Sequence, residues 1–417
     1  MSRNLPDFAS MPTVVVQSAG LRPKSSRGVP MSRRACIVLA TSLMVLMLTA
    51  SSAAAYVPAP GPVFNNPYSG SVAVRTRILN HVLGAIRHSP KGSTIQFAIY
   101  SFDRPDLGDA LVAAHRRGVH VQMVLNDNTI SKQTQRLQGI FGDDPTKSSF
   151  VVICHGSCRG GFGNQHMKFY LFSHTGDVRN VVMAGSSNLT GFAARNQFND
   201  LYTVNRAPGM RKLYARIFNQ LKFDKAVAHP FVTGTTGIYR SYFYPHPNTT
   251  KSNDPVMRRL NGVRCHAVGG TGYKGDTVLR ILMYGWVGKR GLYLADKVAS
   301  LKKSGCRVNV ILSNGGQSVA GHLRHAGVAV RTADMRKRSD GTFARFTHEK
   351  WMSLDGNFQG RGTKIVWTGS ENWSDIATHN DEDVVQVPRA HAYNAYLSNF
   401  EFIWKNHSRK TGVKYGE

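Results

Sequence analysis

Two short motifs that combine a histidine, a lysine and an asparagine occur twice in the sequence. In each copy a His-x-Lys triplet is followed, further along the chain, by the turn Gly-Ser-x-Asn. The shared residues are His166, Lys168 and Asn188 in the first copy, and His348, Lys350 and Asn372 in the second. Because residues two apart in a strand point to the same face, each triplet can direct its imidazole and its ammonium group into one pocket. A single triplet is expected by chance in a chain with 16 histidines, so the repetition carries the evidence.

These residue types suit the cleavage of a phosphodiester without a metal ion. The reaction needs a nucleophile, an acid that protonates the leaving oxygen, and fixed positive charge around the phosphoryl oxygens. One histidine supplies the nucleophile, the other supplies the acid, and the two lysines supply the charge. Ser186 and Ser370 of the two turns, together with the asparagines, are expected to donate hydrogen bonds to the phosphoryl oxygens. We expect neither a cofactor nor a metal ion.

A strand-helix-strand unit precedes each motif, and this repetition predicts two similar α/β halves. The expected strand, helix and strand span 92–100, 107–117 and 119–125 in the first half, and 275–284, 292–303 and 306–312 in the second. Strands joined by a helix run parallel, so each half is expected to contain parallel strands with helical crossovers. Residues 227–274, rich in Pro, Gly, Thr and Asn, are expected to form a linker or an elaborated loop.

At these motifs the chain resembles the phospholipase D superfamily. The superfamily motif is His-x-Lys, an Asp five positions after the Lys, and Gly-Ser-x-Asn, and the resemblance extends from about residue 72 to 404. The second copy has the Asp, as Asp355, whereas the first has Ser173 there and Asp177 four residues later. The resemblance implies a pseudo-twofold α/β fold with mixed or largely parallel sheets flanked by helices. It also implies that His166 is the nucleophile, which forms a phosphohistidine, and that His348 is the acid and base.

Superfamily members place an acid shortly after the turn to orient each imidazole through its second nitrogen. In this chain Asp200 precedes Leu-Tyr-Thr-Val and Asp383 precedes Val-Val-Gln-Val. We therefore predict that Asp200 and Asp383 orient the histidines, with Glu382 as a substitute. The alternative is that these acids are solvated residues at the starts of strands.

The first 55 residues have the pattern of a targeting segment. From Met31 two arginines precede an apolar run over 35–50 and then the small residues 51–55. This order is typical of a secretory signal cleaved after Ala55, and a membrane anchor is the alternative. The expected organisation is 1–55, extension and signal; 56–226, first half; 227–274, linker or loop; and 275–417, second half. The mature protein is then expected to be secreted.

Four cysteines remain after removal of the signal, and an even number in an exported chain favours disulfides. Cys154 and Cys158 can close a small loop, which leaves Cys265 for Cys306, although two other pairings are possible. Zinc bound near Cys154 and Cys158 by neighbouring histidines is the rival, but the spacing matches no standard zinc module.

A glycine-rich loop at 154–163 runs directly into His166. If a disulfide fixes this loop, it is expected to form a rim of the pocket, where Arg159 is available to an anionic group. The alternative is an ordinary tight turn.

The chain is strongly basic, with 53 Lys and Arg against 24 Asp and Glu in 417 residues and a net charge of +29. Residues 1–55 hold six basic residues and one acid, so the remainder still carries +24. A hydrophobic content of 41% excludes a disordered polycation. Such a surface attracts phosphates of nucleic acid, an anionic membrane or an acidic envelope, although solubility is a sufficient alternative explanation.

The sequence therefore predicts a secreted, monomeric phosphodiesterase that hydrolyses a phospholipid. The alternative is a metal-independent endonuclease of the same superfamily that acts on DNA or RNA. A non-catalytic phosphate-binding protein is the third class, which the complete His, Lys and Asn set in both copies disfavours.

Overall fold

The computed structural model describes residues 56–333 and 345–410. The expected signal, residues 1–55, lies outside the described residues. Among the described residues, no helix combines the length and the apolar character that crossing a bilayer requires.

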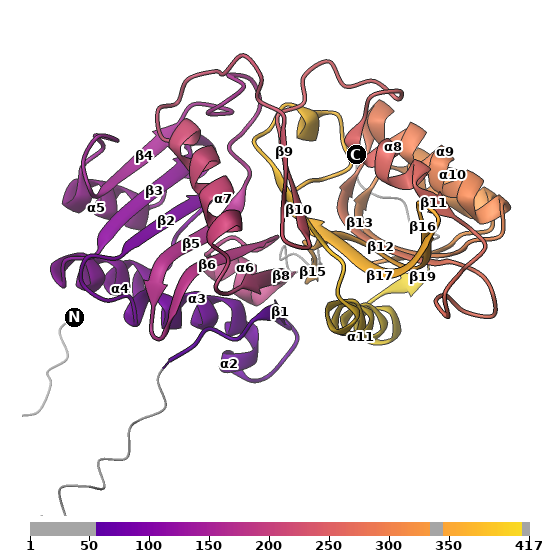
Figure 1. The fold of residues 1–417 in the computed structure, drawn as a ribbon, viewed down its shortest axis with the longest axis horizontal. Coiled ribbons are helices and arrows are strands. Elements are labelled where there is room, and N and C mark those ends of the chain that lie inside the picture. The colour runs from indigo at the N-terminus through magenta and orange to yellow at the C-terminus, as the bar shows by residue number, and fades with distance from the viewer. Residues whose placement is uncertain (1–55, 334–344, 411–417) are drawn as a thin grey trace, which may run out of the picture. The chain divides into compact units, whose positions relative to one another are not determined.

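The first half of the chain forms a seven-stranded sheet with helices on both faces (Figure 1). The strand order is β1-β8-β6-β5-β2-β3-β4, in which β2, β3 and β4 are parallel and the other pairs are antiparallel. The elements of this half are β1 (Gly61–Phe64), α2 (Val72–Arg75), α3 (Arg77–Arg87), β2 (Thr94–Ile99), α4 (Pro105–Arg116), β3 (His120–Asn126), η1 (Asp127–Thr129), α5 (Lys132–Phe141), β4 (Phe150–Cys154), β5 (Lys168–Thr175), β6 (Val178–Gly185), α6 (Gly191–Asn196), β7 (Gln197–Phe198), β8 (Asp200–Val204) and α7 (Pro208–Leu221).

The second half repeats this architecture in a ten-stranded sheet. The strand order is β19-β14-β13-β12-β16-β17-β18-β10-β9, with β11 paired to β16. The elements are β9 (Val232–Thr236), β10 (Tyr239–Phe243), α8 (Pro255–Asn261), β11 (Val263–Arg264), β12 (Val278–Trp286), α9 (Gly288–Lys303), β13 (Arg307–Gly315), α10 (Gln317–His325), β14 (Ala329–Thr332), β15 (Phe346–Thr347), β16 (Lys350–Phe358), β17 (Arg361–Gly369), η2 (Ile376–Thr378), β18 (Asp383–Val387), α11 (Ala390–Asn406) and β19 (Arg409–Lys410). The expected fold class, two similar α/β halves with mixed sheets flanked by helices, is confirmed.

Part of the segment 227–274 belongs to the second sheet, and loops connect these strands. It contains β9, β10, α8 and β11, and β10 pairs with β18 in antiparallel register. The Tyr and Phe side chains at 242–244 are buried, and this burial explains why the hairpin joins the sheet despite its polar composition.

Alternation of side chains along β5 builds two cores at once. Phe169 and Leu171 belong to a central core that contains residues of α7 and α11 from both halves. Tyr170 and Phe172 face the opposite side, where α3, α4 and α5 cover the first sheet. A third core lies under α8, α9 and α10 of the second half. The central core is therefore shared, and it fixes how the two motif-bearing sheets meet.

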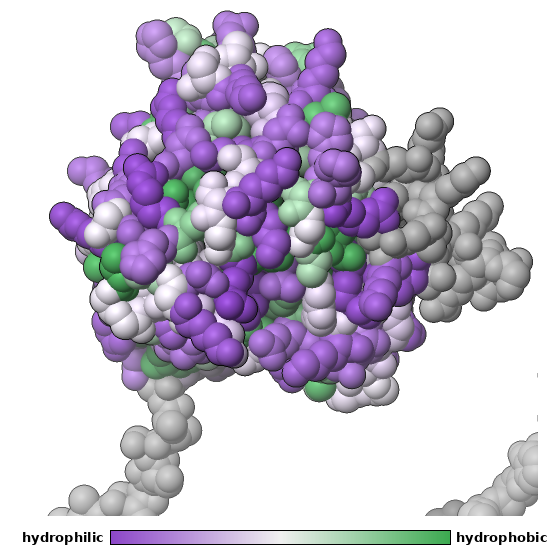
Figure 2. Space-filling view, turned by 90° about the vertical axis from the view of Figure 1, so that its right-hand side faces the viewer, coloured by the Kyte–Doolittle hydropathy of each residue, from purple (hydrophilic) through white to green (hydrophobic). Residues whose placement is uncertain are grey.

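The outer face of the second half is mainly hydrophilic. Figure 2 shows this side of the molecule, where hydrophobic residues are scattered among polar ones. This distribution agrees with the excess of basic residues in the sequence.

Both expected disulfides are present. Cys154 is bonded to Cys158 and Cys265 to Cys306, at sequence separations of 4 and 41. The zinc alternative is wrong, because the Cys154 and Cys158 sulfurs are bonded to each other.

The two disulfides should differ in their effect on stability. A cross-link lowers the entropy of the unfolded chain more when it closes a longer loop, so replacing Cys265 and Cys306 by Ala should lower the free energy of unfolding by about 4 kcal/mol, against about 2 kcal/mol for Cys154 and Cys158. Urea unfolding of the two double variants measures the difference. Equal losses would show that loop length does not determine the effect.

Candidate active site

Each histidine lies in the short segment that leads into the central strand of its half. Lys168 and Lys350 are the first residues of β5 and β16, and the two histidines precede them. The Nζ atom of each lysine donates a hydrogen bond to the carbonyl oxygen of the histidine two residues earlier. The triplet therefore turns each ammonium group back beside its imidazole.

The backbone of each histidine is held by the opposite half of the chain. The N–H of His166 donates to the carbonyl of Asp381 at 2.9 Å, and the N–H of His348 donates to the carbonyl of Phe198 at 2.9 Å. Strands β7 and β15 pair in parallel at the second of these contacts. Each copy of the motif is thus bonded to the opposite half of the chain through an equivalent backbone hydrogen bond of the same length.

The two imidazoles have different hydrogen-bond partners. His166 Nδ1 lies 2.9 Å from both carboxyl oxygens of Glu382, and His348 Nδ1 lies 3.0 Å from the amide oxygen of Asn199. Both partners present acceptor oxygens, so Nδ1 carries the hydrogen and Nε2 is the basic nitrogen in each ring. One histidine is therefore paired with a carboxyl group and the other with a neutral amide.

The expectation that Asp200 and Asp383 orient the histidines is not met. Asp200 instead accepts hydrogen bonds from Thr368 and, at 2.7 Å, from the hydroxyl of Tyr396. Asp383 accepts a bond of 3.4 Å from the backbone N–H of Lys168. Successive side chains alternate in direction at the start of a strand, so the residue before each Asp faces the histidines.

Glu382, which precedes Asp383, was expected as a substitute partner of a histidine. The role of Asn199, which precedes Asp200, as the partner of His348 was not expected. The repeat contained the signal, because Asn199 and Glu382 occupy equivalent positions, directly before an Asp.

The serines of the two turns support these partners. Ser186 Oγ accepts from the N–H of Asp200 at 3.0 Å, and Ser370 Oγ accepts from the N–H of Asp383 at 3.0 Å. Both serines are fully buried. Their hydroxyl oxygens therefore hold the strand starts that carry Asn199 and Glu382, and donation of their O–H groups to the phosphoryl oxygens stays a prediction.

The glycine of each turn is required by a close approach of the neighbouring strand. A Cβ atom on Gly185 would lie 2.4 Å from the carbonyl oxygen of Asp200, and one on Gly369 would lie 2.0 Å from that of Asp383. Any larger residue would push away the strands that hold the imidazole partners.

The two asparagines differ in their surroundings. The Oδ1 atom of Asn372 accepts from the N–H of Gly285 at 3.1 Å. Asn188 is 8% exposed, and its Oδ1 atom has no partner in the part of the chain that the structure describes. Both remain predicted donors to the bound phosphoryl group.

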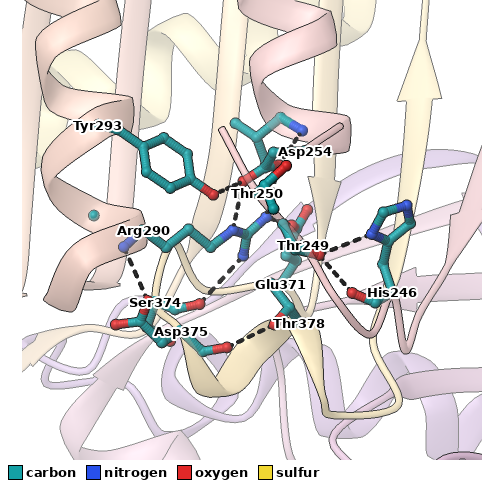
Figure 3. Close-up of polar contacts among 12 residues, drawn as sticks. His246, Thr249, Thr250, Asp254, Arg290, Tyr293, Glu371, Ser374, Asp375 and Thr378 are labelled. Atoms are coloured by element: carbon teal, nitrogen blue, oxygen red, sulfur yellow. Dashed lines mark hydrogen bonds and ion pairs between the residues drawn. The ribbon is translucent and has the colours of Figure 1, made fainter. Parts of the chain in front are cut away.

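A buried ionic network fixes the turn of the second half (Figure 3). Arg290 contacts Glu371 at 2.5 Å and Asp254 at 2.8 Å, and it donates at 3.1 Å to the carbonyl of Asn372. Arg259 holds the other carboxyl oxygen of Glu371 at 2.7 Å. These charges are compensated by short ion pairs, as buried charges require, and they position Asn372.

Two tyrosines that were not among the expected site residues border the histidines. The ring of Tyr100 lies 5.1 Å from that of His166, and the ring of Tyr284 lies 4.8 Å from that of His348. The Nζ atom of Lys350 lies 4.9 Å from the Tyr284 ring. The signal was their equivalent position at the end of the first strand of each repeat.

Burial and positive charge set the protonation states of the site. Burial, reinforced by the neighbouring lysines, lowers the pKa of His166 and of His348 well below the usual value. Burial also lowers the pKa of Lys168 to about 8 and raises the pKa of Glu382 to about 8. At neutral pH the free site therefore presents two neutral imidazoles beside cationic Lys168, an arrangement that attracts a phosphoryl anion.

Two further expected residues have structural contacts. Asp355 accepts from the N–H of Gly272 at 2.9 Å and lies 3.4 Å from the ammonium of Lys364, so it supports the β16–β17 hairpin. Arg159 is fully buried and donates at 2.8 Å to the carbonyl of Tyr244. The expectation that Arg159 is available to an anion is therefore wrong.

Comparison with known proteins agrees with the duplicated architecture. The sequence matches the family described as cardiolipin synthase, PLD-like domain, over residues 83–222 and 277–404. It is 34% identical over 119 residues to the mitochondrial cardiolipin hydrolase of Xenopus tropicalis, an alignment that covers 27% of this chain and 50% of the relative. The enzyme of the same name from Xenopus laevis is 27% identical over 159 residues, with 37% and 65% covered. The chain thus spans less than two thirds of the length of these relatives.

A solved structure shows the same fold. The phosphatidylserine synthase of Haemophilus influenzae Rd KW20 superimposes with a TM-score of 0.54 at 12% identity, covering 86% of this chain and 89% of the synthase.

The neutral partner of His348 should contribute to the low pKa of this imidazole. Asn199→Asp places a carboxylate beside the ring and near Lys350, so it should raise the pKa of His348 by about one unit or more. NMR titration of the histidine ring signals measures the shift. Asn199→Ala removes the acceptor without adding charge and should leave the pKa low, whereas equal titration of all three proteins would contradict the assigned contact.

Proposed function

The chain belongs to the phospholipase D-like family described as cardiolipin synthase, PLD-like domain, and we propose that it is a phosphodiesterase that hydrolyses a phospholipid. One observation carries this proposal: two largely inaccessible imidazoles, 13% and 6% exposed and each held at Nδ1 by the opposite half, lie beside two lysines. This set provides a nucleophile, an acid and fixed positive charge.

The proposed reaction has two steps. Nε2 of His166 attacks phosphorus, the bond to the leaving alcohol breaks, and the Nε2–H of protonated His348 gives its proton to the leaving oxygen. Water then attacks the phosphohistidine, neutral His348 accepts the proton of that water, and the bond between His166 and phosphorus breaks. Lys168 and Lys350 balance the charge on the phosphoryl oxygens throughout.

The unequal partners support these roles. A phosphorylated imidazole is cationic, and this charge favours the ionised form of Glu382, whose pKa is about 8 in the free site, so that the carboxylate beside Nδ1 stabilises the charge on His166. Asn199 provides His348 with an acceptor but no negative charge, so protonated His348 releases its proton more readily. This asymmetry favours His166 as the nucleophile, in agreement with the superfamily resemblance.

The relatives and the disulfides support the proposed substrate and location. The names of the curated relatives refer to cardiolipin, a phospholipid, and this supports a phospholipid substrate.

The sequence pattern over 1–55 and two disulfides support export to an oxidising compartment. Both motifs lie on one chain, so we propose a monomeric enzyme. The net charge of +29 favours an endonuclease as the second candidate.

The catalytic residues can be tested individually on phosphatidylcholine vesicles. His166→Ala and His348→Ala should each lower turnover by about three orders of magnitude or more, since each removes a reacting group. Glu382→Gln keeps the shape but loses the compensating charge, so it should lower turnover by about 10²–10³-fold. Near-normal activity in either folded histidine variant would contradict the two-histidine mechanism.

A parallel assay with EDTA separates the candidate substrates. The purified mature protein should cleave phosphatidylcholine in the chelator, because lysines rather than a metal ion neutralise the phosphoryl group. Vanadate or tungstate should inhibit by occupying the same donors. Cleavage of plasmid DNA without lipid cleavage would favour the endonuclease. Loss of all activity in EDTA, including on a soluble short-chain lipid, and recovery with Mg²⁺ or Ca²⁺ would contradict the mechanism.

A further inference from the structure

Four exposed hydrophobic side chains lie on loops and short helices that border the histidine pair. We call them the apolar rim: Ile130, Phe162, Phe192 and Ile376, which are 44%, 66%, 41% and 42% exposed. Exposed side chains of this size gathered at one site are a feature of interaction surfaces, whereas single ones occur on any protein. The exposure of these four side chains is therefore not explained by packing within the protein.

An unbroken series of aromatic contacts joins Phe192 to the second histidine. The ring of Phe192 lies 6.2 Å from that of Phe346, and Phe346 lies 5.7 Å from Tyr284. Tyr284 in turn lies 4.8 Å from His348. Phe192 therefore stands at the outer end of an aromatic wall that leads to the site.

Phe162 and Ile376 lie near the first histidine, beside His379. The ring of Phe162 is 5.2 Å from that of His379. Ile376 begins the short helix η2, and its carbonyl accepts at 2.9 Å from the N–H of His379, which follows the helix. After Phe162 the chain runs along residues 380–381 and reaches His166, whose N–H bonds to Asp381. These two rim residues therefore border the same entrance from the other side.

Ile130 continues this side of the rim. It follows η1, in which the hydroxyl of Thr129 donates at 3.5 Å to the carbonyl of Tyr100. The ring of Tyr100 contacts that of His166 at 5.1 Å. Ile130 thus lies on the loop that packs beside the first histidine.

The duplicated motif places two rim residues at equivalent positions. Phe192 follows Asn188 by four residues, and Ile376 follows Asn372 by four residues. The pseudo-twofold relation between the halves thus presents an exposed apolar side chain on each side of the histidine pair.

From this arrangement we propose that the apolar rim inserts into the surface of a phospholipid bilayer that contains anionic lipid. The proposal rests on the proposed lipid substrate and names how the site reaches it. The catalytic histidines are only 13% and 6% exposed, so a headgroup phosphate must be brought to the entrance. Hydrophobic side chains in the interfacial region hold the entrance there, and the basic chain is attracted to anionic headgroups.

A nucleic acid explains the rim less well. Exposed aromatic rings can stack on unpaired bases, but two of the four rim residues are isoleucines, which have no ring to stack. Aliphatic and aromatic side chains both enter the apolar boundary of a bilayer. The composition of the rim therefore favours a lipid surface.

The test compares two triple variants with equal numbers of exposed hydrophobic residues removed. The rim variant is Phe162→Ser with Phe192→Ser and Ile376→Ser. The control is Phe223→Ser with Ile140→Ser and Ile238→Ser, which are 48%, 45% and 42% exposed and lie outside the rim. Sedimentation with vesicles of phosphatidylcholine and phosphatidylglycerol should show at least a tenfold weaker partition for the rim variant and less than a twofold change for the control. Equal partition of the rim variant and the wild type would overturn the proposal.

Two further measurements separate this proposal from the catalytic one. Turnover of a short-chain phosphatidylcholine below its micelle concentration should stay within twofold in the rim variant, which also shows that the variant is folded. If the wild type cleaves no phospholipid, the proposed function fails, while vesicle binding still tests the rim. Phe162→Leu with Phe192→Leu should keep vesicle binding. A different pair of results would contradict the proposal: the leucine variant loses affinity for a single-stranded oligonucleotide, and the serine rim variant binds vesicles as well as the wild type. The rim would then be a base-stacking surface.

Discussion

The hydrogen bonds that cross between the two halves are the constraint on which the site depends. His166 receives both its backbone acceptor and its imidazole partner from residues 381–382, and His348 receives both from residues 198–199. Neither half alone can fix the tautomer or the direction of its own histidine. The central core under α7 and α11 therefore has a chemical consequence, because a small shift between the sheets would separate both imidazoles from their partners.

Differences between the repeats give two equivalent positions unequal properties. Glu382 corresponds to Asn199, and the buried Glu349 lies between the histidine and lysine of the second triplet where the first has Met167. Burial raises the pKa of Glu349 to about 8, although the indole N–H of Trp351 donates to it at 2.6 Å. A strictly symmetric site would make the two histidines interchangeable. Under the proposed mechanism, the substitutions around them favour His166 for covalent attack and His348 for proton transfer.

Features that are encoded by repeats and residue spacing could be predicted from the sequence. Contacts that depend on how the strands of one half align with those of the other half could not. The strand-helix-strand units and the motif residues follow from local patterns. The Cys154–Cys158 pair follows from its three intervening positions, and this leaves Cys265 for Cys306. Whether Asn199 or Asp200 faces the histidine depends on how β7 meets β15, which no local pattern contains. Arg159 illustrates the same limit, because the groups that bury it come from segments distant in the sequence.

The low pKa values of the histidines pose a difficulty that the substrate itself resolves. An acid that protonates the leaving oxygen must be cationic, yet burial and the neighbouring lysines disfavour the cation on His348 in the free protein. A bound phosphodiester adds a negative charge between the lysines and the imidazoles, and this opposes their effect and raises the pKa of both rings. Glu382 has its pKa raised to about 8 by burial, so it is largely neutral beside His166 in the free site and does not favour a proton on that ring; it ionises to compensate the charge that His166 acquires on attack. In the proposed mechanism, the proton is therefore favoured on His348 when a phosphoryl group occupies the site, so binding of the substrate and activation of the acid are one electrostatic event.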